Sequence, residues 1–188
     1  MKYYNLPKSI EIEGINYEIR SDFRAVLDIF CALNDPELSD RERGEVVLDI
    51  LYPSFYTGEM PPEHYEEALK KALWFINGGE EDKTSTKPMK LMDWEQDFPY
   101  IVAPVNRVAG CDVRSLPYLH WWTFLSFYNE IGECLFSQIV GIRKKRKMGK
   151  KLDKSEREWY LQNRSIVDLK THYTEQEDDV LKQWISGK

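Results

Sequence analysis

The three histidines, His64, His120 and His172, are the first candidates for metal chemistry, and they lie far apart in the sequence. None belongs to an HxxxH, HExxH or CxxC pattern, which are spacings that bring metal ligands together. His120 lies beside Trp121 near the expected start of a helix, and we expect it to be a hydrogen-bonded core residue. The sequence therefore predicts no metal site.

Motifs for nucleophiles and phosphates are missing from the sequence as well. Neither GxGxxG nor GxSxG occurs, and the Lys83-Thr84 pair lacks the glycine that precedes the lysine of a phosphate-binding loop. Cys31 and Cys134 lie on apolar helix stripes, where we expect core positions, and Cys111 lies in a turn. Three cysteines without CxxC spacing indicate a reducing compartment. We expect a protein that is not an enzyme and that has no cofactor.

One segment is strongly basic. Residues 143–151 carry seven positive charges in nine positions, namely Arg143, Lys144, Lys145, Arg146, Lys147, Lys150 and Lys151. Cations at a helix end gain about 0.3–1 kcal/mol from the helix dipole, and one or two of them suffice. Seven exceed this requirement, so the run predicts contact with an acidic protein surface or with nucleic acid. No aromatic residue is interleaved with it, which argues against stacking on single strands.

Residues 118–128 are rich in aromatic side chains, which at helical spacing are typical of a core. Adjacent helix residues point about 100° apart, so Trp121 and Trp122 are not both expected to enter one core. We predict that one of them packs against a neighbouring helix or a partner chain. The predicted partner-binding residues are Trp121, Trp122, Arg143, Lys144, Lys145, Arg146 and Lys147.

The elements that must position these residues are mainly helical. Alternating apolar residues on both sides of Glu13-Gly14 predict a β-hairpin over residues 9–20. Residues 54–60 are predicted to be a loop. Capping residues and apolar spacing predict helices over residues 22–33, 39–51 and 63–76. The fold class is therefore mainly α, a helical bundle with a small N-terminal β-hairpin.

The second half is predicted to be helical throughout. Asp93 caps a helix in which Pro99 and Pro104 predict a kink or a break. Ser115 caps one long helix that runs to about residue 142. Asp153 is predicted to cap a further helix, whose apolar face includes Ile166 and Leu169. Thr174 is predicted to cap the last helix. The predicted organisation is a hairpin plus three helices over residues 1–77, a linker over 78–90, and a C-terminal helical lobe over 91–188.

Composition limits the class of protein. The chain has 188 residues, of which 42% are apolar and 31% charged, and its net charge is −6. Residues 1–92 have a net charge of −7 and residues 93–188 one of +1, so the chain is not a globally basic nucleic-acid binder. No run reaches 18 apolar residues, and no signal-peptide core follows Met1. We expect no membrane partner and a cytoplasmic location.

Five strings occur together in a distinctive order. They are residues 91–98 (LMDWEQDF), 118–124 (YLHWWTF), 142–145 (IRKK), 149–153 (GKKLD) and 163–169, which contains Asn163-Arg164 followed by Ile166-Val167-Asp168-Leu169. In these strings the chain resembles the gene-product-fifteen family of tailed bacteriophages and prophages of Gram-positive hosts. The resemblance is strongest over about residues 88–170.

This resemblance implies a gene of the long-tailed phage (siphovirus) tail module and a place in the cytoplasm of the bacterial host. The family is similar in position and size to tail assembly chaperones, which coat the tape-measure protein and recruit tail-tube subunits. The implied partners are thus the tape-measure protein and the tail-tube protein. Independently of the resemblance, the acidic first half and the basic cluster predict that the chain can associate with itself as a homo-oligomer. The alternatives are a nucleic-acid-binding phage protein that uses residues 143–151, although nucleic acid is the less expected partner, and a minor structural tail or connector component.

Overall fold

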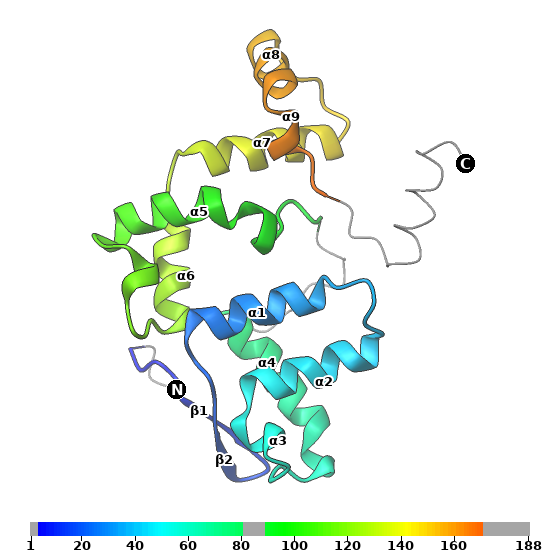
Figure 1. Ribbon diagram of the computed structural model, residues 1–188, viewed down its shortest axis with the longest axis vertical. Coiled ribbons are helices and arrows are strands. Elements are labelled where there is room, and N and C mark those ends of the chain that lie inside the picture. Colours follow the sequence, from blue (N-terminus) through cyan, green and yellow to red (C-terminus); the bar gives the residue numbers. More distant parts are fainter. Residues whose placement is uncertain (1–3, 81–88, 171–188) are drawn as a thin grey trace. The chain divides into compact units, whose positions relative to one another are not determined.

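The structure of the chain is a computed structural model that describes residues 4–80 and 89–170 (Figure 1). The described residues form nine α-helices and one two-stranded antiparallel hairpin, so the predicted mainly α fold with a small hairpin is confirmed. Their contacts divide them into two compact units, unit 1 over residues 4–80 and unit 2 over residues 89–170. Most of the predicted linker, and the helix predicted after Thr174, lie outside the described residues.

Unit 1 begins with the predicted hairpin, whose strands are β1 (Ser9–Ile12) and β2 (Ile15–Glu18). Glu13 and Gly14 form the turn, with φ angles of 49° and 78°. Two successive left-handed residues match the twist of a hairpin with a two-residue loop, and Gly14 adopts this conformation without strain. Ile10 pairs with Tyr17 across the strands, and both side chains are buried. The alternation seen in the sequence therefore places one face of the hairpin on the core.

Four helices and a short 3-10 turn complete unit 1: α1 (Phe23–Leu33), α2 (Asp40–Leu51), α3 (Pro53–Tyr56), η1 (Pro62–His64) and α4 (Tyr65–Ile76). Asp22 caps α1, and Ser39 with Glu42 forms the predicted capping box of α2. The loop predicted over residues 54–60 is wrong for residues 54–56, which belong to α3. Pro53 begins that helix, because the fixed φ of proline suits the first helical position.

The core of unit 1 lies where α2 contacts α1, α3 and α4. Its buried side chains include Phe23, Ile29, Leu51 and Phe75. Since α1 buries the face that contains Phe23 and Ile29, Cys31 is exposed, and the core position predicted for it is wrong.

Unit 2 contains α5 (Trp94–Ala109), η2 (Val113–Ser115), α6 (Trp121–Asn129), α7 (Leu135–Lys147), α8 (Lys154–Gln162) and α9 (Arg164–Val167). Asp93 caps α5 as predicted, and Gly110 ends it with φ 72°. α5 continues through Pro99 and Pro104, so no break occurs there. Each proline removes a backbone donor, and the packing of α5 against both α6 and α7 holds the helix together.

The single long helix predicted after Ser115 is wrong. α6 ends at Asn129 and α7 begins at Leu135, and the chain between them includes Gly132 with φ 62°. Cys134 is half-buried as the N-cap of α7, not a core residue, and its N–H donates to Ser137 Oγ at 2.8 Å. The left-handed Gly132 and the cap at Cys134 separate α6 from α7, although apolar residues keep helical spacing across the gap.

The helix predicted after Asp153 begins with the expected capping box but ends at Gln162. Asn163 ends it, because its backbone leaves the helical region with φ −117° and ψ 21°. Its N–H and its side-chain amide both donate to the carbonyl of Trp159, at 3.0 and 2.9 Å. α9 then forms one further turn, which buries Val167 against Ile139 and Ile142 of α7. No helix in the described parts of the chain is long and apolar enough to cross a membrane.

Candidate protein-interaction surface

The basic segment lies at the C-terminal end of α7, and most of its side chains are bonded within unit 2. Lys145 forms an ion pair with Glu156 of α8, and Lys147 Nζ donates to the carbonyl of Lys90 at 2.6 Å. Lys144 is exposed and has no ion pair with any described residue. The run therefore meets acidic groups and carbonyls of its own unit.

Arg143 is the most deeply placed member of the run. It is 4% exposed, and its guanidinium binds both carboxylate oxygens of Asp97 at 2.6 and 2.9 Å. The other N–H groups donate to the carbonyls of Leu91, Ile166 and Val167 at 3.1, 3.0 and 2.6 Å. All five guanidinium donors are thus satisfied inside the unit. The structure therefore gives Arg143 an interior role, which corrects its prediction as a partner contact.

Gln96 continues this arrangement one residue before Asp97. Its Nε2 donates to the carbonyl of Asp168 at 3.0 Å, and its Oε1 accepts from the N–H of Lys170 at 2.8 Å. Arg143, which is held by Asp97, and Gln96 bind the backbone of residues 166–170, and we call these three residues the latch. It fixes the last described segment of unit 2 against α5 and α7.

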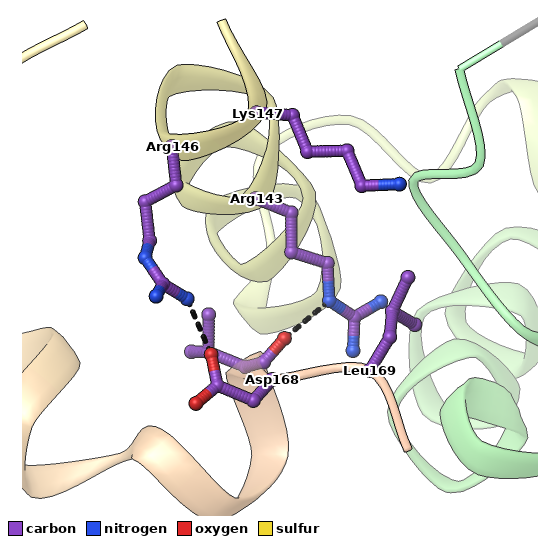
Figure 2. Close-up of a pocket in the computed structure, with 6 residues that line it drawn as sticks. Arg143, Arg146, Lys147, Asp168 and Leu169 are labelled. Carbon is purple, nitrogen blue, oxygen red and sulfur yellow. Dashed lines mark hydrogen bonds and ion pairs between the residues drawn. The ribbon is translucent and has the colours of Figure 1, made fainter. Parts of the chain in front are cut away.

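Arg146 lies on the opposite side of the same segment. It forms an ion pair with Asp168, and its guanidinium lies 4.3 Å from the centre of the Tyr160 ring. Figure 2 shows Arg146 and Arg143 reaching toward Asp168 and the backbone next to it, where Arg143 Nε donates to the carbonyl of Val167. Both arginines line a pocket of about 370 Å³. Because both arginines are already paired, this pocket does not offer two unpaired cations to an anion.

The pKa of Asp168 makes the stability of this part of unit 2 at acid pH testable. Burial alone raises it, but hydrogen bonds from Arg164, Arg146 and Tyr160 outweigh burial, so the pKa of Asp168 lies below its ordinary value. A carboxyl group whose pKa is lowered on folding stabilises the protein above its unfolded pKa, and this contribution is lost as the pH falls through the folded value.

We expect Asp168→Asn to lower the free energy of unfolding by about 1 kcal/mol at neutral pH, the size of a half-exposed ion-pair network. The difference from the natural chain should disappear as the pH falls below the folded pKa of Asp168. Urea unfolding at a series of pH values measures both effects. Glu158→Gln, at an exposed position on α8 without an ion pair among the described residues, is the control. A difference that stayed constant with pH would contradict the assignment.

Four cations beyond α7 are not used inside the unit. Lys150, Lys151, Lys154 and Arg157 are exposed, and none forms an ion pair with a described residue. The first two follow Met148 and Gly149, where α7 ends, and the other two lie three residues apart on α8. We call these four residues the cationic edge. The sequence predicted contact through residues 143–147 of α7, whereas these four unpaired cations all follow α7, two in the connection to α8 and two on α8 itself.

The structure separates the two tryptophans of the aromatic segment. Trp121 is 1% exposed and packs against Trp94 and Phe124, with ring centres 5.9 and 5.7 Å away. Trp122 is only half-buried. His120 is 2% exposed and its Nδ1 accepts from the N–H of Trp122 at 3.0 Å, which confirms it as a hydrogen-bonded core residue. Of the predicted pair, Trp122 is therefore the residue with surface available to a partner.

An apolar groove of unit 2 was not predicted. Its volume is about 350 Å³, and it is lined by Leu91, Met92, Tyr128, Asn129, Ile131, Phe136, Ser137 and Val140. Tyr128 Oη donates to Met92 Sδ at 3.3 Å, and burial followed by the nearby charge of Asp97 raises the pKa of Tyr128 to about 12. The tyrosine therefore stays neutral at physiological pH. The groove opens where α6 ends and α7 begins, so it depends on the break that the apolar periodicity concealed.

The described parts of the chain contain no group of three or more His, Cys, Asp or Glu side chains placed to hold a metal ion. His64 is instead bonded to Tyr17, with 2.7 Å between Nδ1 and Oη.

A small helical chain with a cationic edge and an apolar groove has the features of a protein-binding module. The family model described as Bacteriophage Gp15 protein matches residues 4–169, and the chain belongs to that family. It is therefore a bacteriophage protein, as the ordered strings indicated. Comparisons with curated proteins and with solved structures give no match.

Proposed function

We propose that the chain is a non-enzymatic tail-assembly protein of a phage, a chaperone that shields the tape-measure protein and helps to recruit tail-tube subunits. Membership in the Bacteriophage Gp15 protein family is the observation that carries this proposal. A tape-measure protein is a very long, largely helical chain that would aggregate if left bare. A protein that covers its apolar faces keeps it soluble until the tube forms around it.

The apolar groove of unit 2 supports this role. Its walls combine methionine, aromatic and branched aliphatic side chains, which suit the apolar face of an amphipathic helix. Methionine is adaptable, so one groove accepts helices of differing sequence, as repeated binding along one long chain requires. Many copies on the same chain then gain from avidity.

Co-expression tests the proposal directly. The tape-measure protein should be more soluble when this chain is present, and the two should purify as a complex. We expect Val140→Glu to reduce the co-purified amount, because it places a charge in the groove. Gln138→Glu adds the same charge to an exposed position of α7 that does not line the groove, and it should leave the complex intact.

Two results would contradict the proposal. One is a tape-measure protein whose solubility does not change and that forms no complex. The other is a high copy number of this chain in purified virions, measured by mass spectrometry, which favours a structural tail component over a chaperone. The neighbouring genes provide an independent check, since a tail module should place a tail-tube gene upstream and a very long tape-measure gene downstream.

A further inference from the structure

The two units carry opposite charge. Residues 4–80 hold 7 Lys/Arg and 16 Asp/Glu, a net charge of −9, whereas residues 89–170 hold 14 and 10, a net charge of +4. The division is sharper than the one between the two halves of the sequence. One unit of this chain is therefore electrostatically complementary to the other unit of a second copy.

The complementary groups are exposed on both units. In unit 2 they are the cationic edge, Lys150, Lys151, Lys154 and Arg157, which the fold leaves without ion pairs among the described residues. In unit 1 the hairpin carries Glu11, Glu13 and Glu18, all exposed and likewise without an ion pair in the described parts of the chain.

The hairpin presents its carboxylates in a fixed arrangement. Ser9 lies opposite Glu18 and Glu11 opposite Asn16, so both glutamates are on the outward face while Ile10 and Tyr17 face the core. Diagonal neighbours on one face of a hairpin are about 7–8 Å apart. Lys151 and Lys154 lie close together in the sequence, on the two sides of Asp153, the residue that caps α8.

We infer that the cationic edge of one copy binds the acidic hairpin face of a second copy. The two surfaces differ, so each bound copy still offers one free hairpin and one free edge, and the contact repeats in a head-to-tail chain of copies. Nucleic acid is the weaker fit for the same cations, because unit 1, with its charge of −9, would be repelled by the phosphates.

This contact involves only copies of this chain, so it succeeds or fails independently of the proposed tape-measure role. Analytical ultracentrifugation of the purified full chain should show concentration-dependent self-association at about 0.1 M salt. The association should weaken toward about 1 M salt, where the Debye length falls from about 10 Å to about 3 Å. Lys151→Glu/Lys154→Glu and, separately, Glu11→Lys/Glu18→Lys should each weaken it about tenfold or more.

A charge exchange provides the control for folding. The two double variants should associate with each other when mixed, and a chain carrying all four changes should recover self-association at the natural net charge. A chain that stays monomeric at all concentrations and salts overturns the inference. A natural chain that binds a short DNA duplex while staying monomeric would assign the cationic edge to nucleic acid instead. A chain with all four changes that self-associates as weakly as the double variants would also overturn the inference.

Discussion

Replacing Arg143 with methionine is expected to lower the free energy of unfolding of unit 2 by about 3–5 kcal/mol. The change removes five hydrogen bonds and leaves the Asp97 carboxylate, whose side chain is 0% exposed, without its counter-ion. Asp97 Oδ2 also accepts from the N–H of Asp93 at 2.9 Å, so the unpaired charge lies at the first turn of α5. Urea unfolding followed by tryptophan fluorescence measures the loss.

The neighbouring residue supplies the matched control. Lys144→Met makes the same kind of change one position along α7, at an exposed side chain, and should shift stability by less than about 0.5 kcal/mol. Combining Arg143→Met with Asp97→Leu removes both charges and should recover part of the loss, because the main cost is the unpaired carboxylate. If Arg143→Met were no more harmful than Lys144→Met, the latch would not hold unit 2 together.

The parts of the fold that the sequence predicted well are those set by short-range contacts. Ser39 and Glu42 close a capping box within one turn, and Glu13-Gly14 turns the hairpin without help from the rest of the chain. Such signals need residues no more than about four positions apart. The hairpin, the capped helix starts and the mainly α class follow from them.

The latch depends on a contact between residues that are 46 positions apart in the sequence, and no local pattern encodes it. The basic run concealed it, because charge alone does not distinguish an inward arginine from its exposed neighbours. A finer signal was present. Arg143 lies seven residues after Phe136 and four after Ile139, so it shares the buried face of α7 with both. A cation on the apolar face of a helix indicates a buried acidic partner elsewhere in the chain.

The break between α6 and α7 was missed for the opposite reason. Ile131 and Leu135 keep helical spacing across it, so periodicity favoured one continuous helix. Gly132 in a left-handed conformation and the Cys134–Ser137 cap are the local features that interrupt it. Because the apolar groove lies at that break, missing the break also meant missing the groove.

The adjacent tryptophans should respond very differently to truncation. Trp121→Ala is expected to cost about 3–5 kcal/mol of unfolding free energy, because it removes a fully buried ring that packs on Trp94 and Phe124. Trp122→Ala should cost only about 1 kcal/mol, since its side chain is half-buried. Thermal and urea unfolding of the two variants measure the difference.

The same two variants also distinguish an effect on folding from an effect on partner binding. Because Trp122→Ala keeps unit 2 folded, any loss of tape-measure co-purification in that variant reports a missing contact and not an unfolded protein. Trp121→Ala would lose binding through loss of structure, which its unfolding curve would reveal. Equal destabilisation by the two substitutions would contradict the orientation of α6, and it would leave neither tryptophan assigned to the surface.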